Sequence, residues 1–388
     1  MIKPKKKNPI LRTRLPTLPP GARSRAALGL TAAAALGRFE LQQCRDCQAV
    51  QYPPREACHR CLSIRLVWKI QSGKGELLAE TLLHHSNDLF FRERLPWRLG
   101  LVRLECGPTV VAHLHSDIEK NSSKVTIRAM LDRAGQAVLA ALPDKETSNM
   151  ADDRQLREFT CDPKFRKVLV TDGKTALGQS LVRILVEAGA DLVWVGYSEP
   201  WKKFPGFSEL QKIPQVTLLP LDVTDSNNVR EVAAEIGGKV DILVNNAEFH
   251  RAFGIGNRAG VETARSEMDV NYFGLLRVDR QQVHPGHRAR LAVGTFSASK
   301  AAAHSLAQCL RAEMRPAGVR VVNVFPGPID DEWNQLLPPP KLAPDALAKS
   351  VVRALQEGVE DVYPGDVAQE WLERWRDNPK ALERELSA

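Results

Sequence analysis

Between residues 64 and 142 the chain consists mainly of alternating and β-branched runs, which predict strands. These runs cover residues 64–70, 75–84, 95–106, 108–116 and 124–133, and glycine-containing turn signals at 72–75, 106–108 and 134–136 separate them. Five or six short strands of this size favour a small closed barrel of the OB type. We therefore expect an OB-fold barrel over residues 64–142.

From residue 167 the pattern changes to short apolar runs that alternate with segments of helical period. Strands are expected at residues 167–171, 191–196, 216–221, 240–245 and 319–325, and helices at 179–188, 228–236 and 296–315. This alternation predicts a doubly wound parallel sheet, that is, an α/β Rossmann domain over residues 167–388. The stretch at 143–166 begins with charged residues that have no apolar period, so it is expected to be a linker.

The first 25 residues carry as much positive charge as the whole chain has in excess. The net charge is +8, eight lysines and arginines lie in residues 1–25, and the first acid is Glu40. Interleaved prolines predict an extended basic arm, which either solubilises the chain or binds an anionic partner such as a nucleotide-bearing thioester or an acidic carrier protein. Nucleic acid is an unlikely partner, because no aromatic platform accompanies the arm.

No apolar run approaches the roughly 20 residues that cross a bilayer, so no membrane partner is expected. The Ala/Leu segment at 26–36 is short, contains Gly29 and Thr31, and leads directly into a cysteine motif. It predicts an amphipathic or capping helix rather than an export signal. A cytoplasmic location follows as the expectation.

Two CxxC motifs separated by ten residues form the first chemical signal; their cysteines are Cys44, Cys47, Cys58 and Cys61. Each motif places two sulfurs on one side of a tight turn, so the pair can close a tetrahedron around Zn²⁺. Disulfides are disfavoured, because the other cysteines (Cys106, Cys161 and Cys309) occur singly in apolar segments. Iron is the minor alternative, and His59 is a competing ligand that four cysteines make unnecessary. A helix and structural zinc ribbon are thus expected over residues 26–63.

Residues 25–142 resemble the zinc-ribbon/OB-fold proteins that accompany thiolase-like enzymes and are associated with acyl-CoA. The resemblance is carried by the two CxxC motifs, by Pro53-Pro54-Arg55 between them, and by Ser72-Gly73-x-Gly75 after Trp68. It implies a scaffold or substrate-handling module, with an acyl-CoA or acyl thioester as substrate and a thiolase-like protein as partner. Oligonucleotide binding is the alternative at the level of the fold.

Residues 167–366 resemble the short-chain dehydrogenase/reductase family. The matching segments are Leu221-Asp222-Val223, Asn245-Asn246-Ala247, Asp269-Val270-Asn271, Ser297-Ala298-Ser299-Lys300 and Pro326-Gly327-Pro328-Ile329. The resemblance implies an NAD or NADP cofactor and a homodimer that pairs through the helix carrying Lys300. The cofactor-binding positions that it implies are Thr171, Gly173, Gly178, Asp222, Asn245, Ala247, Lys300, Pro326 and Gly327.

The phosphate-binding turn departs from the family pattern TGxxxGxG. Asp172 replaces the first glycine and Ala176 the second, and only Gly178 is kept. The glycines of such a turn let the backbone approach the pyrophosphate at a helix N-terminus. The negative charge of Asp172 opposes binding of the pyrophosphate, and Gly173 and Lys174 partly compensate for it. Glu248 adds a second carboxylate where relatives have glycine.

The second strand ends in Gly196-Tyr197, which offers neither the acid typical of NAD sites nor the arginine typical of NADP sites. Lys202 and Lys203 follow a few residues later. They give NADP a slight preference over NAD.

The catalytic positions that the resemblance implies are Asn271, Phe296 and Lys300. The family has tyrosine where this chain has Phe296, and a nearby lysine lowers the pKa of that phenol so that it can pass a proton. The family's serine has no counterpart, because only about 25 residues separate Asn271 from Phe296. The missing piece is expected to include much of the fifth strand, of which residues 289–293 are a remnant.

Replacements for the missing proton donor are few. The histidines His284 and His287 titrate near neutrality but are more simply exposed loop residues, and Thr295 is a poor acid. Losing the donor costs on the order of 10²–10⁴ in rate.

Three functions therefore compete. The first is NAD(P)(H)-dependent oxidoreduction of a keto- or hydroxyacyl thioester, impaired here by the missing Tyr and Ser. The second is a non-catalytic acyl-CoA-binding scaffold or accessory subunit of a thiolase-like enzyme. The third, nucleic-acid binding through the barrel and the basic arm, has the least support.

Overall fold

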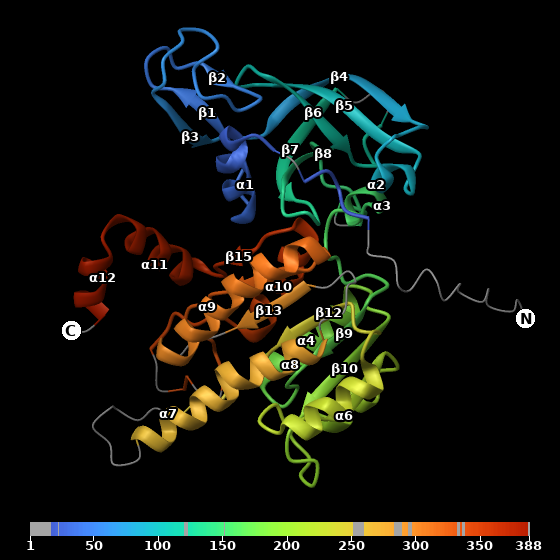
Figure 1. Cartoon of the computed structure of the whole chain (residues 1–388), viewed down its shortest axis with the longest axis vertical. Coiled ribbons are helices and arrows are strands. Elements are labelled where there is room, and N and C mark those ends of the chain that lie inside the picture. Colours follow the sequence, from blue (N-terminus) through green and yellow to red (C-terminus); the bar gives the residue numbers. More distant parts are fainter. Residues whose placement is uncertain are drawn as a thin grey trace, which may run out of the picture.

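The chain, described here by a computed structural model, has the ribbon and barrel at one end of its long axis and the Rossmann domain at the other (Figure 1). The structure describes residues 17–21, 23–119, 123–150, 152–250, 260–282, 289–293, 297–331, 334–335 and 338–386. The predicted fold class is confirmed: a small ribbon and a closed barrel precede a parallel α/β sheet. Most of the predicted basic arm lies outside the described residues.

The ribbon combines a helix with a three-stranded sheet in the order β2-β1-β3. Its elements are η2 (Arg25–Ala27), α1 (Leu28–Ala35), β1 (Glu40–Cys44), β2 (Val50–Gln51) and β3 (Leu66–Ile70). The apolar run at 64–70, expected among the barrel strands, instead pairs with β1, from Glu40 opposite Ile70 to Cys44 opposite Leu66. Alternation of side chains identifies a strand but does not identify its partner.

Five strands close the barrel in the order β4-β5-β6-β8-β7. They are β4 (Lys74–Leu83), β5 (Trp97–Leu104), β6 (Thr109–Leu114), β7 (Lys124–Leu131) and β8 (Ala137–Pro143), with the short helices α2 (Leu89–Arg92) and α3 (Arg154–Arg157) beside them. β8 is not among the runs expected from the sequence. It closes the barrel by pairing parallel with β6 and antiparallel with β7.

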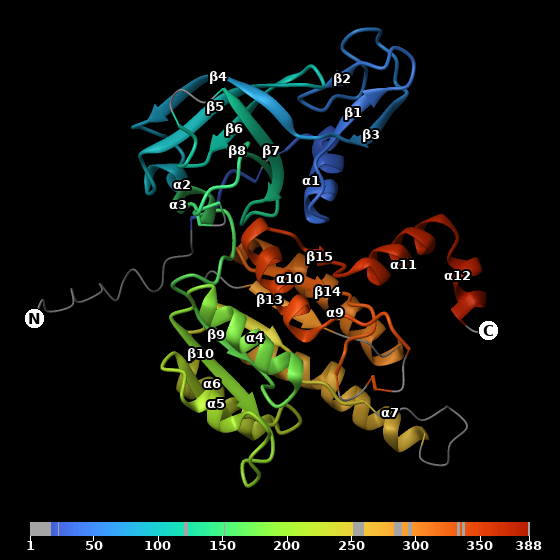
Figure 2. The same cartoon turned by 180° about the vertical axis from the view of Figure 1, so that it is seen from behind.

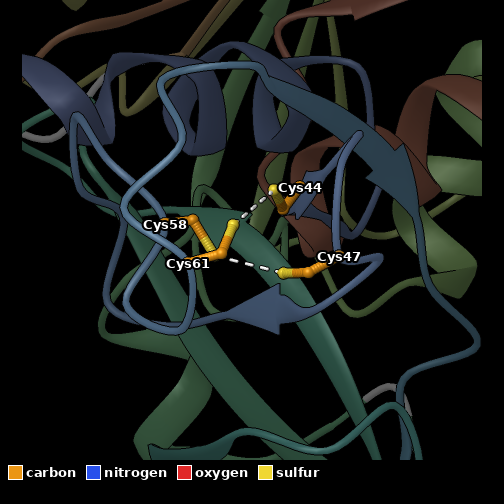
Figure 3. Close-up of side chains that lie close together, drawn as sticks. All are labelled: Cys44, Cys47, Cys58 and Cys61. Carbon is orange, nitrogen blue, oxygen red and sulfur yellow. Dashed lines mark hydrogen bonds between the residues drawn. The ribbon is translucent and has the colours of Figure 1, made fainter.

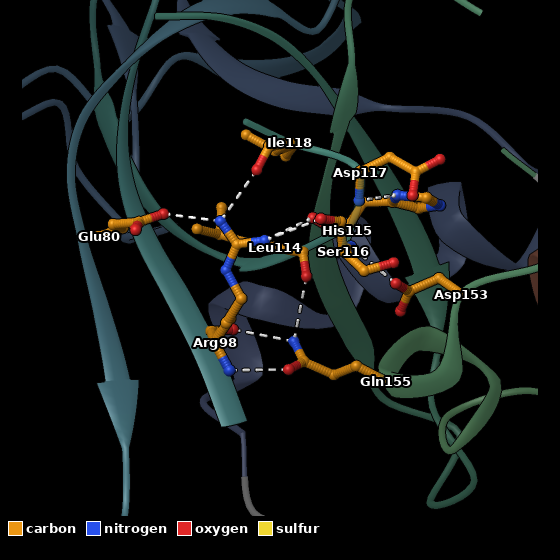
Figure 4. Close-up of polar contacts among 9 residues, drawn as sticks. All are labelled: Glu80, Arg98, Leu114, His115, Ser116, Asp117, Ile118, Asp153 and Gln155. Carbon is orange, nitrogen blue, oxygen red and sulfur yellow. Dashed lines mark hydrogen bonds and ion pairs between the residues drawn. The ribbon is translucent and has the colours of Figure 1, made fainter. Parts of the chain in front are cut away.

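The predicted linker is packed against the barrel by side-chain hydrogen bonds. Asp153 Oδ2 accepts from the backbone N of Ser116, and Gln155 Oε1 accepts from the backbone N of Arg98, both at 2.7 Å (Figure 4). The Gln155 amide also donates to the backbone O of Arg98 at 2.8 Å. Further along, Phe159 is fully buried in the barrel's aromatic cluster. The segment therefore holds a fixed position.

The Rossmann domain has a seven-stranded sheet, parallel throughout, in the order β11-β10-β9-β12-β13-β14-β15. Its strands are β9 (Lys167–Val170), β10 (Leu192–Tyr197), β11 (Val216–Pro220), β12 (Ile242–Asn245), β13 (Ala289–Val293), β14 (Arg320–Val324) and β15 (Asp361–Val362). Its helices are α4 (Ala176–Glu187), α5 (Phe207–Gln211), α6 (Ser226–Ile236), α7 (Gly260–Met268), η3 (Asp269–Gly274), α8 (Leu275–Gln282), α9 (Ser297–Met314), η4 (Arg315–Ala317), α10 (Pro344–Glu357), α11 (Asp366–Asp377) and α12 (Pro379–Leu386). The strand order reverses between β9 and β12, which is where such sheets bind ligands.

Helices cover both faces of this sheet, as the central strand β9 shows. Val168 and Val170 belong to the core that contains α4 and α10, whereas Leu169 belongs to the core that contains α6 and α8. A strand buried on both faces is continuously apolar, as expected for a parallel sheet.

The fifth strand of the sheet is complete, which corrects the expectation that most of it is missing. β13 pairs with β12 on one side and, over all five of its residues, with β14 on the other. Only three residues, 294–296, separate it from α9, and they lie outside the described residues. The shortening therefore falls in the connection that follows the strand.

The chain ends in α11 and α12, which pack on each other and project from the sheet (Figures 1 and 2). Trp371 and Trp375 of α11 keep part of their surface exposed. Within the described residues, every helix is too short or too polar to span a membrane.

The barrel docks on the edge of the sheet where the strands begin. Arg320, the first residue of β14, is 4% exposed, and its Nη1 donates to the backbone O of Leu131 in the barrel at 2.8 Å. The same guanidinium donates to the backbone O of Gly358, which has φ +74° and lies so close to Leu131 that a Cβ there would be 2.7 Å from the Leu131 O. The strand ends that bind ligands therefore point away from the barrel (Figure 2).

His113 gives the barrel a predicted acid sensitivity. Trp97 Nε1 donates to His113 Nδ1 at 2.9 Å, and burial, helped by the charge of Arg23, lowers the pKa of His113 from 6.5 to about 4. Above pH 6.5 the ring is neutral in both states; between pH 6.5 and 4 only the unfolded chain binds the proton. Stability should therefore fall over that window as the pH is lowered, by up to about 3 kcal/mol, and this contribution should stay lost below pH 4.

Urea unfolding at pH 7, 5.5 and 4.5 measures this effect. A His113→Gln variant, which keeps an acceptor for Trp97, should show a flatter pH dependence, whereas His85→Gln, at an exposed position, should behave like the native chain. An unchanged slope in His113→Gln would refute the assignment.

Candidate functional site

The structure brings the four cysteines of the ribbon together (Figure 3). All four sulfurs lie within 4.8 Å of one another, with Cys44 Sγ 3.5 Å from Cys61 Sγ and Cys47 Sγ 3.6 Å from Cys58 Sγ. Tetrahedral Zn²⁺ with bonds of about 2.3 Å needs sulfurs about 3.8 Å apart, so the donor set fits zinc. Four thiolates leave no coordination position for a substrate, which makes the site structural.

Backbone N–H groups support the thiolate form of two of these cysteines. Asp46 N donates to Cys44 Sγ and Arg60 N to Cys58 Sγ, each at 3.4 Å. Hydrogen bonds from the turn backbones lower the pKa of Cys58 and bring the pKa of Cys44 down to about 7. His59 lies outside the cluster, because its backbone N donates to Gln51 Oε1 at 3.0 Å and its ring lies against the same oxygen.

The phosphate turn after β9 is compact and closed by its own hydrogen bonds. Thr171 Oγ1 accepts from the backbone N of Asn246 and of Ala247, both at 3.0 Å. Gly178 packs so closely that a Cβ there would lie 2.3 Å from the Asp172 O, which explains why this glycine is kept. The Asp172 carboxylate turns back and accepts from the backbone N of Lys174 at 2.7 Å. It therefore occupies one of the N–H donors that the turn offers an anion.

The Lys174 ammonium reaches the end of β10. Its Nζ donates to Ser198 Oγ at 2.6 Å and lies 3.7 Å from Glu199 Oε2. Lys203, one of the two lysines expected there, instead lies over the ring of Phe207. The end of the second strand is where a dinucleotide-binding sheet meets the adenosine ribose. Lys174 thus places a positive charge at this strand end, beside the carboxylate of Glu199.

Asp222 lies at the end of the next strand and is exposed. Its Oδ1 accepts from the backbone N and the Oγ1 of Thr224, at 2.9 and 2.7 Å. Pro326 and Gly327 follow β14, where Gly327 packs on Val367 of α11. These predicted cofactor residues therefore follow the ends of two different strands of the sheet.

Several predicted residues line one cavity of about 270 Å³ at the carboxyl ends of the strands. They are Thr171, Asn245, Ala247, Asn271 and Lys300. The described lining also includes His304, which the sequence analysis did not single out; its spacing of four residues from Lys300 places it on the same helix face. Gly173, Gly178, Asp222, Pro326 and Gly327 are not among the described lining residues.

Asn271 positions the wall of this cavity. It lies in the π-helical turn η3, a feature frequent at functional sites. Its Oδ1 accepts from Phe249 N at 2.9 Å, and its Nδ2 donates to Phe249 O and to Ser299 Oγ, both at 3.0 Å. The buried amide thus fixes the segment that follows β12 against α9.

Lys300 is engaged by the carboxylate that replaces the family's glycine. Its Nζ lies 3.2 Å from Glu248 Oε2, with both side chains largely buried. The ammonium charge that should act on a phenol and on a cofactor ribose is therefore neutralised within the chain. The sequence shows both residues, but not that they meet.

Phe296, the third predicted catalytic residue, lies outside the described residues, as do Thr295, His284 and His287. In the sequence Phe296 stands four residues before Lys300, at the position of the family's tyrosine. A phenylalanine has no proton to donate at that position.

The fold and the cleft define a dinucleotide-binding domain of the dehydrogenase type joined to a zinc ribbon and an OB barrel. Family models described as "ChsH2, rubredoxin-like zinc ribbon domain" and "ChsH2, C-terminal OB-fold domain" match residues 31–66 and 68–127, and a model described as "short chain dehydrogenase" matches 166–285 and 283–340. The chain belongs to the short-chain dehydrogenase/reductase family.

Two relatives support that assignment. "Dehydrogenase/reductase SDR family member 7C" of Xenopus tropicalis is 31% identical over 238 residues, which cover 54% of this chain and 73% of the relative. "Dehydrogenase/reductase SDR family member 7B" of Mus musculus is 31% identical over 184 residues, 41% of this chain and 56% of the relative. The chain therefore spans little more than half of the mouse protein.

A solved structure of the same family is similar to the Rossmann domain. A short-chain dehydrogenase from Burkholderia cenocepacia J2315, in complex with NADP, is 32% identical with a TM-score of 0.54. The match covers 58% of this chain and 99% of that chain. The remaining part of this chain includes the ribbon and the barrel.

Proposed function

We propose that the Rossmann domain binds a nicotinamide dinucleotide, NADP in preference to NAD, and catalyses oxidoreduction of a keto- or hydroxyacyl thioester only weakly. The contact between Lys300 and Glu248, at 3.2 Å, is the observation that carries this proposal. A bound nicotinamide supplies or accepts the hydride. The chain's own lysine, however, is paired with a carboxylate, and position 296 has no hydroxyl to move the proton.

Binding is supported by the parts of the cleft that remain intact. Thr171, Asn245, Ala247 and Lys300 share one cavity at the reversal of strand order. Lys174 at the end of β10 supports NADP, and the Burkholderia relative was solved with NADP. Asp172 and Glu248 oppose binding by placing carboxylates near an anionic ligand.

Glu248→Gly should tighten NADPH binding about tenfold, because it removes a carboxylate and frees the Lys300 ammonium. Isothermal titration calorimetry of the native chain, Glu248→Gly and the isosteric Glu248→Gln measures the change. Adding Phe296→Tyr to Glu248→Gly should raise turnover of a β-ketoacyl thioester on the order of 10²-fold. If neither the native chain nor Glu248→Gly binds NADPH or NADH at millimolar concentration, the nicotinamide proposal is overturned.

A second candidate is an accessory subunit of a thiolase-like enzyme, suggested by the outer face of the barrel. Leu101 pairs with Val111 across β5 and β6, and both are exposed, as is Leu82 on β4. Exposed aliphatic groups on neighbouring strands favour a protein partner. Co-purification with a thiolase-like enzyme, lost in Leu101→Glu, tests it. We further propose that the chain forms a homodimer paired through α9 and that it is cytoplasmic.

A further inference from the structure

A second cavity, of about 480 Å³, lies between the barrel and the Rossmann domain. Its walls come from β7, β8, the connector with α3, α4 and α10. Ile184 lies eight residues after the start of α4, which at 1.5 Å per residue is about 12 Å from the phosphate turn. The cavity thus lies toward the strand starts, away from the nicotinamide cleft.

The floor of this cavity is apolar and is contributed by both domains. Met130, Leu142 and Leu156 belong to the barrel's aromatic core, whereas Ile184 and Val352 belong to the core of the sheet. Protein interiors contain few voids larger than a water molecule, so two apolar cores that face each other across an open space are unusual. The volume falls within the range of small-molecule sites, which favour domain boundaries.

Basic side chains gather at the α10 side of the cavity. Arg128 Nη1 lies 2.9 Å from Glu357 Oε1, and Arg353 Nε lies 3.5 Å from the same oxygen, so two guanidinium groups share one carboxylate. Lys349, one turn earlier on α10, is exposed and adds a third positive charge. The α10 side of the cavity therefore has an excess of positive charge.

Apart from Gln356 on α10, the remaining polar groups of the lining belong to the connector and α3, where the one cation among them, Arg157, is paired with Asp152. Asp153 accepts from the backbone N of Ser116 and of Leu156, Asp162 and Thr160 are buried in the wall, and Glu146 is exposed. Burial raises the pKa of Asp162. These acids leave the α10 side as the place where an anionic group meets least repulsion.

We propose that this interdomain cavity binds a linear acyl chain with an anionic head, the chain between the apolar walls and the head at Arg128, Lys349 and Arg353. A coenzyme A thioester and a free fatty acid share this chemistry. The site goes beyond the proposed nicotinamide function, because it has its own lining and lies at the opposite edge of the sheet. Binding there joins surfaces of both domains.

Calorimetric titration of the full, zinc-loaded chain with dodecanoyl-CoA, octanoyl-CoA, dodecanoate and CoA alone tests the proposal. We expect an acyl ligand to bind at least tenfold more tightly than CoA, and affinity to rise with chain length by up to about fourfold per buried methylene. Binding of dodecanoyl-CoA alone identifies the thioester as the source, and binding of dodecanoate identifies the free acid. Equal affinity for CoA and dodecanoyl-CoA, or no binding of any acyl ligand, overturns the proposal.

Variants locate the ligand. Ile184→Trp fills the floor and should weaken acyl binding at least tenfold. The double variant Lys349→Glu/Arg353→Glu changes exposed positions, so it should fold normally and weaken binding about five- to tenfold; Arg376→Glu/Lys380→Glu, an equal charge change on α11 and α12, should not. If the Lys349→Glu/Arg353→Glu variant binds the acyl ligand as tightly as the native chain, the proposed site is refuted, even if Ile184→Trp does not fold. NADPH affinity should stay constant in both, which separates this result from a failure of the nicotinamide proposal.

Discussion

Replacing both Cys47 and Cys61 by serine should remove the metal and unfold the CxxC segment of the ribbon at residues 45–65. Leu30 and Ala34 of α1 and Leu41 of β1 are buried in the barrel core, whereas the segment at 45–65 contributes only the partly buried Val50 and Tyr52 to it, so the metal supplies most of the stability of that segment. Structural zinc contributes about 10–16 kcal/mol in zinc-finger peptides, and two ligands cannot complete a tetrahedron. Elemental analysis should show a fall from about one zinc per chain to none.

Limited proteolysis should then cut the segment at residues 45–65 while leaving the Rossmann domain intact. Cys309→Ser is the matched control, because Cys309 is an exposed thiol on α9, outside the cysteine cluster. A double variant that retains stoichiometric zinc would contradict the four-thiolate assignment. Iron in place of zinc in the native chain would change the metal but not the ligands.

Arg320→Ala should weaken the docking of the barrel on the Rossmann domain, so that the two unfold separately. The guanidinium is buried, and its loss leaves the carbonyl groups of Leu131 and Gly358 without their donor at the domain boundary. Leaving such groups unpaired costs about 1–3 kcal/mol each, so we expect a loss of roughly 2–5 kcal/mol. Scanning calorimetry should show a lower melting temperature and a barrel transition that precedes the sheet transition.

Arg353→Ala supplies the comparison. Its side chain is 78% exposed and makes only a surface pair with Glu357, which predicts a change within about 0.5 kcal/mol. Equal melting behaviour of Arg320→Ala and Arg353→Ala would show that the domains are held together by other contacts.

Most of the fold is predictable from the sequence, because strands buried on both faces and periodic helices leave clear patterns in residues 167–325. The strand β8 was not predicted, and its burial explains why. Val138, Ala140 and Leu142 belong to the aromatic core, whereas Leu139 and Ala141 belong to the barrel core, so both faces of the strand are buried. Such a strand has no polar alternation by which to recognise it.

The candidate site could be predicted from the sequence only where its residues belong to short motifs. The spacing around Lys300 and Asn271 identifies both residues, and Glu248 stands out as a substituted glycine. The contact between Glu248 and Lys300 joins positions 52 residues apart, and the reach of Lys174 to Ser198 depends on how two strands lie side by side. Neither contact follows from spacing, since the sheet alone brings these segments together.

The docking of the barrel on the strand-start edge has a kinetic consequence. Strands of four to six residues at about 3.3 Å per residue place roughly 13–20 Å of sheet between the two ends. A molecule released by one end must therefore enter the bulk solvent before it reaches the other, unless a second chain receives it. An isotopically labelled ligand released at one end should accordingly exchange freely with an unlabelled pool, and either end can change in the course of evolution without altering what the other binds.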